Sequence, residues 1–293
     1  MDTRTIALSR SIDMVDRFNS NIDALLGLLG ESDVVILPAG SAIEIYKTSG
    51  TLNNTQVAEA QLINLSDYKS ELVDTKSLAF NKYRALIGVE SIARMGYEKA
   101  IVRPFNKLVS DVQANIRASI FTALGTGTGT ATAGNTLQAA LANAWAAVEE
   151  GFDGVNYTPV FFINTTDAAE YLGTANILLA ERFGLRYMEN FLGLGNVIVD
   201  KNVPQGTVYA TAAQNLIVYA PDASGISEGE LDFYSDETGL LAITRDPKAE
   251  NAAEQIVVIS GVAVFPLYID KIFVGAIEPE EAAEEADDNE GEH

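Results

Sequence analysis

The segment of residues 48–84 constrains the fold most, because it is long and polar and has no pattern that could build its own core. It is rich in Asn, Ser, Thr and Lys, and its only alternation, around Leu78, Phe80 and Leu86, is weak. A structureless connection of this length is uncommon inside a compact domain, and an isolated hairpin is marginally stable at best. We therefore expect an extended arm or long hairpin that buries its apolar positions against another surface.

The residue types that most enzymes and metal sites require are missing. The chain of 293 residues has no cysteine, and its single histidine is His293, the last residue. Disulfides, thiolate nucleophiles and Cys-based metal sites are therefore excluded, and no internal imidazole can act as a general base or a zinc ligand. We expect no catalytic, cofactor-binding or metal-binding residues, and a protein that is not an enzyme.

Three glycine patterns resemble chemical motifs but lack essential partners. Residues 225–229 match the G-x-S-x-G elbow of serine hydrolases, which needs an internal histidine to take the serine proton. Residues 125–134 are rich in Gly and Thr but lack the lysine of a phosphate-binding loop, and residues 193–195 lack the third glycine of a dinucleotide fingerprint. We expect a surface turn, a flexible link and a loop, respectively.

Adjacent carboxylates are expected by chance in a chain with 41 acidic residues. For Glu149–Glu150 and Asp236–Glu237 we therefore favour exposed acids at a helix end or turn over glycosidase groups or a divalent-cation site. The single tryptophan, Trp145, falls on an apolar helical stripe, which favours core filling over ligand stacking.

Charge is unevenly distributed along the chain, whose net charge is −22. Residues 67–117 carry nine bases and six acids, whereas residues 278–293 carry nine acids and no base. A net negative charge disfavours the counterion release that drives duplex binding, so sequence-specific DNA recognition is not expected. The basic segment is expected to meet an acidic surface on another copy of the chain. The acidic end is expected to be a disordered tail.

Neither membrane insertion nor secretion is expected. The longest uncharged apolar-rich stretch, residues 255–269, spans fifteen residues and contains Ser260, Gly261 and Pro266, which is too short for a membrane helix. The first residues lack a basic segment followed by an apolar run. We expect a soluble protein that is made inside the cell.

Helical periodicity is the clearest local signal. Pro104 suits a first helical turn and Gly125 suits a helix end, and either Asn135 or Thr136 can cap the helix that follows. Apolar residues at steps of three and four, together with these caps, predict helices over residues 11–30, 104–124, 137–151 and 165–180.

Short apolar runs bounded by turn residues make up most of the remainder, and residues 245–254 are interpreted as a charged loop. The pattern is neither alternating βαβ nor a series of even strands, so we predict a mixed α+β fold. Strands are expected at residues 34–37, 43–46, 158–163, 197–199, 208–219, 231–234, 240–244, 256–264 and 266–277.

In this order the elements resemble the major capsid protein of tailed bacteriophages, which has the Hong Kong 97-type fold. The resemblance covers residues 1–277. It is carried by VESIAR at 89–94, running into the helix that ends at 123–125; PVFFINTTDAAEYL at 159–172; GNVIVD at 195–200, leading to VPQG at 203–206; and ISGVAV at 259–264, leading to KIFVG at 271–275.

The resemblance implies an α+β chain with an N-arm, an E-loop, a peripheral domain with a long spine helix, and an axial domain. The implied boundaries are 1–33 for the N-arm; 34–149 for the first part of the peripheral domain, with the E-loop at about 45–86 and the spine helix at about 104–124; 150–225 for the axial domain; 226–277 for the peripheral-domain strands, which flank the P-loop of that fold at 245–254, and for the return to the axial domain; and 278–293 for the acidic disordered tail.

The resemblance also implies a structural role. The expected protein assembles with itself into hexamers and pentamers of an icosahedral shell, which encloses double-stranded DNA without reading its sequence. It is made in the host cytoplasm and resides in the virion, without membrane contact and without a cofactor. Expected partners are scaffold, portal and decoration proteins. Because only about thirty residues precede the first strand, we expect any scaffold to be a separate protein.

In this family the E-loop lies across a neighbouring subunit, which would supply the surface that the polar segment needs. Since the basic segment 67–117 overlaps the implied E-loop, a positive arm is expected to lie on an acidic copy. The candidates for contacts between subunits are Lys69, Lys76, Lys82 and Arg84.

Three other functions remain open on the sequence alone. A nanocompartment shell of the same fold, similar to encapsulins, would enclose an enzyme rather than DNA. An enzyme that acts through carboxylates would show a cleft with convergent acids of raised pKa. A carbohydrate-binding or partner-binding module would be monomeric with one exposed patch.

Overall fold

The structure of the chain, a computed structural model, describes residues 27, 29, 34–53, 56–96, 98–152, 157–175, 178–182, 184–222, 233–234 and 240–278. Most of the helix expected over residues 11–30 lies outside these residues, as do the turn at 225–229, the acidic pair at 236–237 and the tail after residue 278.

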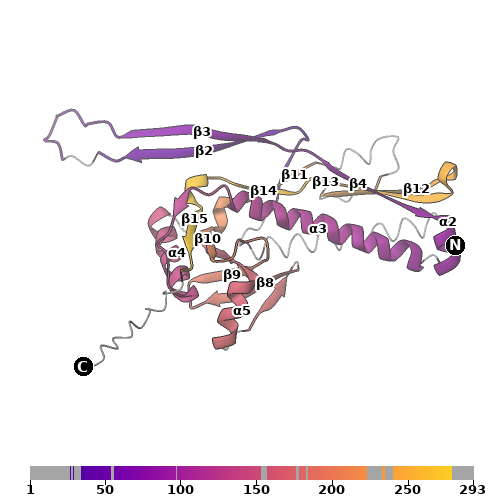
Figure 1. Ribbon diagram of the computed structural model, residues 1–293. Coiled ribbons are helices and arrows are strands. Elements are labelled where there is room, and N and C mark those ends of the chain that lie inside the picture. The colour runs from indigo at the N-terminus through magenta and orange to yellow at the C-terminus, as the bar shows by residue number, and fades with distance from the viewer. Residues whose placement is uncertain are drawn as a thin grey trace, which may run out of the picture.

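A long helix, α3 (Arg103–Leu124), is the axis of an elongated molecule (Figure 1). Strands lie along one side of this helix, a compact body of helices and strands surrounds its C-terminal end, and a two-stranded hairpin projects beyond that body. The mixture of helices with mainly antiparallel sheets agrees with the predicted α+β class.

The apolar stripe that predicts α3 is the stripe that it buries. Phe105, Val112, Ile116 and Ile120 belong to the largest hydrophobic core of the chain. Pro104 lies in the first turn, and the Gly125 N–H donates to the Phe121 carbonyl at 3.0 Å, so both predicted ends are confirmed. The helix is preceded by α2 (Val89–Met95) and a π-helical turn (Glu98–Val102).

Two three-stranded sheets share this core with α3. Their strand orders are β1–β11–β14 and β12–β13–β4, and β14 packs directly on α3. The edge strand β4 follows the hairpin in sequence and leads into α2. The strands are β1 (Val35–Leu37), β11 (Leu216–Pro221) and β14 (Ala263–Pro266), then β12 (Leu241–Lys248), β13 (Ala253–Ser260) and β4 (Asn81–Gly88).

A seven-stranded sheet forms the body, and α4 (Leu137–Gly151) packs on its strands β10 and β15. The predicted buried strand at 158–163 is confirmed as β6, in which Phe161 and Phe162 are fully buried. In sheet order the strands are β5 (Gly129–Thr130), β15 (Phe273–Ala276), β10 (Thr207–Ala212), β6 (Pro159–Ile163), β9 (Gly195–Val199), β8 (Leu185–Phe191) and β7 (Ala180–Arg182).

Thr136, rather than Asn135, caps α4. Its side chain accepts a hydrogen bond from the Ala139 N–H at 3.2 Å, which satisfies one of the free donors of the first turn. Trp145 is partly buried and packs against the second hydrophobic core, between α4 and the sheet. The interpretation of Trp145 as a core residue agrees with this position.

The Gly-Thr stretch at 125–134 is not the flexible link that its composition predicts. Its backbone N–H groups at residues 128, 129, 131 and 134 all donate to carbonyls of residues 269–276, and β5 pairs with β15. A Cβ on Gly134 would lie 2.2 Å from the Ala140 nitrogen, and one on Gly129 would lie 2.7 Å from the Asp270 carbonyl oxygen. Gly129 and Gly134 therefore allow the backbones to pack closely. Composition alone does not indicate this role.

Residues 245–254 are also not a loop. They form the end of β12, a short 3-10 turn (Ala249–Asn251) and the start of β13. Arg245 pairs with Glu254 and Lys248 with Asp246. Opposite charges therefore pair within the β12–β13 hairpin. The many charged residues of this segment do not prevent it from forming strands.

The helix predicted at 165–180 is shorter than expected. Helix α5 (Thr165–Thr174) ends six residues early, and Ala180 begins β7. Its cap is Asn164, whose side chain accepts a hydrogen bond from the Thr166 N–H at 2.7 Å.

The turn between β8 and β9 contains a strained residue. Leu192 has φ +52°, in the left-handed region, and its side chain is 60% exposed. Because this conformation costs a non-glycine residue about 1–2 kcal/mol and glycine costs up to ~1 kcal/mol of unfolded-state entropy, Leu192→Gly should stabilise the fold by roughly 0.5 kcal/mol. The urea midpoint should rise; a midpoint lower than that of the wild type would contradict this account. Leu194→Gly, two residues later in the same turn, is the control and should lower it.

Candidate functional site

Among the described residues, the buried anchor of the hairpin on the body is its root. The hairpin consists of β2 (Ala42–Thr51) and β3 (Asp67–Ser77). At the root, Ile43, Ile45 and Leu78 are buried, and β2 contacts the 3-10 turn Ile269–Lys271. The Gly40 N–H donates to the Leu78 carbonyl at 2.8 Å, and the Leu78 N–H donates to the Ser41 carbonyl at 2.9 Å. This root fixes the direction in which the hairpin leaves the body.

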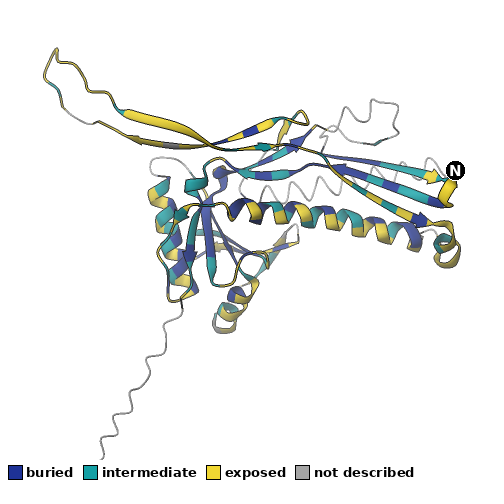
Figure 2. Ribbon diagram, turned by 45° about the horizontal axis from the view of Figure 1, so that its top comes forward, coloured by how far each residue is buried: buried dark blue, intermediate teal, exposed yellow. Residues whose placement is uncertain are grey.

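Beyond the root the hairpin is exposed along almost its whole length (Figure 2). Large apolar side chains are among the exposed residues: Leu62 is 90% exposed, Leu65 93%, Ile63 72% and Leu52 67%. Single exposed apolar residues are ordinary, but a row of them on a projecting element marks an interaction surface. The expectation of an arm or hairpin is confirmed, and among the described residues these side chains remain exposed.

The four predicted contact residues lie on two different elements. Lys69 and Lys76 are on β3, where Lys69 lies opposite Ser49. Lys82 and Arg84 are on β4, opposite Ile259 and Val257 of β13. Although the implied E-loop range of about 45–86 includes Lys82 and Arg84, these two residues belong to the sheet along α3. Lys69, Lys82 and Arg84 are exposed, and Lys76 is partly buried.

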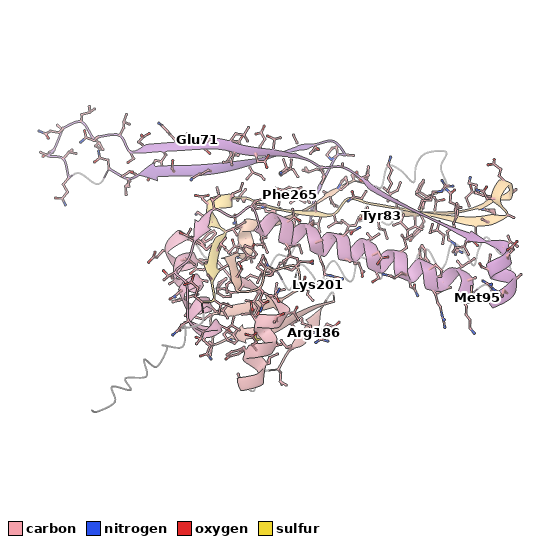
Figure 3. The ribbon with its side chains drawn as sticks, in the orientation of Figure 1. Glu71, Tyr83, Met95, Arg186, Lys201 and Phe265 are labelled. Atoms are coloured by element: carbon pink, nitrogen blue, oxygen red, sulfur yellow. The ribbon has the colours of Figure 1, made fainter. Side chains whose placement is uncertain are left out.

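The hairpin is not the positive arm that the sequence suggested. Between residues 42 and 77 it carries five acids and three bases, whereas residues 81–117 carry seven bases and three acids. The positive charge of the basic segment therefore lies on β4, α2 and α3. Figure 3 shows Glu71, one of the five acids, on the hairpin.

Local ion pairs balance the charges near the root. The Lys76 Nζ lies 2.7 Å from an Asp74 carboxylate oxygen, and this hydrogen bond holds the pKa of Asp74 below its ordinary value. The hydroxyl of Tyr46 donates to Glu44, which raises the pKa of Tyr46. Both groups are exposed, so these pairs add little stability.

Of the two acidic pairs singled out in the sequence, the structure describes Glu149–Glu150. Glu149 of the adjacent pair Glu149–Glu150 accepts a hydrogen bond from the Tyr157 hydroxyl; burial, followed by this contact, raises the pKa of Tyr157 to about 12. Among the residues that the structure describes, no three His, Cys, Asp or Glu side chains group to hold a metal ion. In the same part of the chain, no helix has the length and apolar character needed to cross a membrane.

Sequence reasoning selected three lysines and an arginine as contact residues, and that selection stays a prediction. It did not single out the exposed apolar residues of the hairpin, which include Tyr46, Tyr68 and Leu72. The sequence signal that could have found these residues is the alternation of apolar and polar residues within 42–51 and 67–77. It is hard to recognise because the two strands pair with an irregular register.

Comparison with solved structures identifies the fold. With a chain of the cyanophage A-1(L) capsid the TM-score is 0.56 at 15% identity, covering 87% of this chain and 92% of that chain. With the capsid of a native GTA particle it is 0.52 at 12% identity, covering 86% and 89%. With a structure from Mycobacterium phage Patience it is 0.50 at 9% identity, covering 96% and 90%. No protein-family model matches the sequence, and no curated protein matches it significantly.

These likenesses show a Hong Kong 97-type capsid fold, which confirms the predicted α+β architecture and the resemblance to tailed-phage capsid proteins. At these identities they define the fold rather than the role of the chain.

Proposed function

We propose that the chain is the major capsid protein of a tailed bacteriophage. It is a structural subunit, not an enzyme, and assembles with itself into the hexamers and pentamers of an icosahedral shell that encloses double-stranded DNA. The observation that carries the proposal is the exposed apolar hairpin on a capsid fold. Its large apolar side chains, among them Leu52, Leu62, Ile63 and Leu65, stay exposed within the described part of the chain, and identical copies arranged in a ring can cover them.

The domain roles follow the same proposal. Residues 1–33 are the N-arm and 278–293 a solvated acidic tail. The hairpin is the E-loop, α3 is the spine helix, the sheet β12–β13–β4 belongs to the peripheral domain, and residues 150–225 make up much of the axial domain. Residues 226–277 return to the peripheral strands and then to the axial sheet. Scaffold, portal and decoration proteins are the proposed partners; the chain is made in the host cytoplasm and resides in the virion.

Light scattering of the purified chain over a range of salt and protein concentrations tests self-assembly. We expect pentamers, hexamers or closed shells far larger than the 31.4 kDa chain. Particles from the source culture should contain nuclease-protected double-stranded DNA. Particles that enclose an enzyme instead would favour a nanocompartment shell.

Charge reversal tests the four predicted contact residues. Replacing Lys69, Lys76, Lys82 and Arg84 by Glu together should weaken assembly and reduce its dependence on salt, because opposite charges between copies are screened by ions. The midpoint salt concentration for assembly measures the effect. Shells that form at the wild-type salt midpoint would show that these residues make no contact between copies.

A further inference from the structure

A cluster of exposed bases lies where α2, the π-helical turn and α3 meet. Residues 91–110 carry four bases and one acid. Arg94 lies in the last turn of α2, Lys99 in the π-helical turn and Arg103 at the start of α3. All three side chains are exposed. We call Arg94, Lys99 and Arg103 the basic elbow.

The basic elbow is not neutralised by its own surroundings in the described part of the chain. The fourth base, Lys107, pairs with Asp111 one turn later, but the ion pairs found among the described residues include none of the three elbow bases. Arg103 also stands in the first turn of a helix that has no acid there, although the helix dipole favours acids at that position. An anion supplied from elsewhere would stabilise this arrangement.

The basic elbow is far from the acidic body. Figure 1 shows α2 at the opposite end of α3 from the seven-stranded sheet, and Figure 3 labels Met95 at that end. The 22 residues of α3 span about 33 Å, which is several times the Debye length of about 8 Å at physiological salt. The eighteen acids of residues 118–277 therefore do little to cancel the positive potential of the elbow.

The C-terminal tail has the complementary charge. Residues 279–293 carry eight acids, no base, and no aromatic or large aliphatic side chain. They follow Glu278, whose N–H donates to the Gly134 carbonyl at 2.9 Å at the edge of the body. A segment of this composition can form charge pairs but cannot contribute to a hydrophobic core.

The length of the tail determines which copy it can serve. A flexible segment of fifteen residues has a root-mean-square length of about 21 Å, which is shorter than α3 alone. The tail starts at the body, so it would have to stretch along the whole helix to reach the elbow of its own chain. A neighbouring copy can offer its elbow without that cost.

We propose that the acidic tail of one copy, residues 279–293, binds the basic elbow of a second copy. The inference rests on the proposed function, which brings copies together, and adds a charge contact that does not involve the hairpin. Duplex DNA is the competing polyanion, but three bases offer few phosphate contacts and the many acids of the chain repel it. The contact is screened by salt, so it is strongest at low ionic strength.

Cross-linking between two full-length, single-cysteine variants tests this contact without background, because the chain has no cysteine. One variant carries Asn106→Cys, which is exposed in α3 one turn from Arg103, and the other carries Ala286→Cys in the tail. A short thiol-to-thiol cross-linker should join them into a dimer at low salt, and the yield should fall severalfold in about 0.5 M salt. The control replaces Asn106→Cys by Ala118→Cys, exposed in the same helix but outside the elbow, and should give little dimer.

Charge variants of the Asn106→Cys chain measure the contribution of the elbow. Arg94→Gln, Lys99→Gln and Arg103→Gln together should lower the cross-linking yield roughly tenfold, because three exposed charge pairs are lost. The matched control neutralises three exposed bases that lie outside the elbow and should leave the yield unchanged: Lys47→Gln, Arg186→Gln and Lys201→Gln.

The outcomes separate this inference from the proposed function. Equal yields from Asn106→Cys and Ala118→Cys, or equal losses in the two charge variants, would overturn the docking of the tail. A cross-link that forms only when both cysteines are in one chain would show that the tail binds its own elbow, and cross-linking abolished by equimolar duplex DNA would assign the elbow to nucleic acid. Light scattering on the same samples reports assembly, so the absence of particles counts against the proposed function instead.

Discussion

Replacing residues 46–73 by the dipeptide Asn-Gly is expected to abolish assembly while leaving the body folded. Ile45 and Asp74 are directly opposite in the hairpin, so a two-residue type I′ turn can close the strands there. The buried root residues Ile43, Ile45 and Leu78 remain. The shortened chain loses every exposed apolar residue of the outer hairpin, and with them the proposed contact with the next copy.

Two measurements on this variant separate assembly from folding. Light scattering should report a monomer of reduced mass at all concentrations at which the wild type assembles. The thermal unfolding midpoint of the variant should lie within a few degrees of that of the unassembled wild type, because the deleted residues are exposed. Such a shift corresponds to a change in the free energy of unfolding on the order of 1 kcal/mol. Shells from the shortened chain would show that the hairpin is not needed for assembly.

Asn215→Ala is expected to cause the largest loss of stability for a single substitution among those proposed. Asn215 is 1% exposed, and its side-chain amide donates to the Tyr268 carbonyl at 2.9 Å and to the Thr211 hydroxyl at 3.0 Å. Its carbonyl oxygen accepts from the Tyr268 N–H at 2.7 Å. The Thr211 hydroxyl in turn donates to the Lys271 carbonyl at 2.9 Å.

These hydrogen bonds join the turn between β10 and β11 to the segment that leads from β14 to β15, so they tie the sheet packed on α3 to the sheet of the body. An alanine leaves the Tyr268 N–H and carbonyl, which are partly buried, without these partners, at about 1–3 kcal/mol for each lost partner. The free energy of unfolding should fall by roughly 3–5 kcal/mol.

Chemical denaturation of the full chain, below its assembly concentration, measures this loss. Thr211→Val is the matched variant, since it removes only the hydroxyl of the same network and should cost less than Asn215→Ala. A loss for Asn215→Ala of under about 1 kcal/mol would mean that these bonds are replaced by water and do not join the two sheets.

Local patterns predicted the elements that depend on local interactions. The stripe of α3, the Thr136 cap of α4 and the apolar run of β6 are each determined by residues close in sequence, and each is confirmed. The C-terminal end of α5 and the continuation of β12 and β13 into residues 245–254 were missed, because pairing between strands overrode the composition of these segments.

The candidate site was only half predictable for the same reason. The polar character of residues 48–84 indicated an arm, and the structure confirms one. The faces of that arm depend on the single extra residue Val73, at the β-bulge of β3, and strand register is not visible in either strand alone. The Gly-Thr stretch gives the parallel case: Gly134 is required by the position of Ala140 in α4, a contact made only after the chain has folded.

The charge of the chain is also clearer once the elements are placed. The positive residues of the segment 67–117 gather mainly on β4, α2 and α3, and the hairpin carries a small negative excess. Contacts through Lys82 and Arg84 would therefore be made by the sheet along α3, whereas contacts through the hairpin would be mainly apolar.

Electron cryomicroscopy of particles formed by the purified wild-type chain is the most direct test that copies of this chain build a shell through their hairpins. The account predicts closed particles in which the hairpin of each subunit crosses onto the next, with Leu72 and Tyr68 facing the neighbour. A chain that stays a 31.4 kDa monomer under every condition of salt and concentration, or particles whose hairpins touch no neighbour, would contradict it.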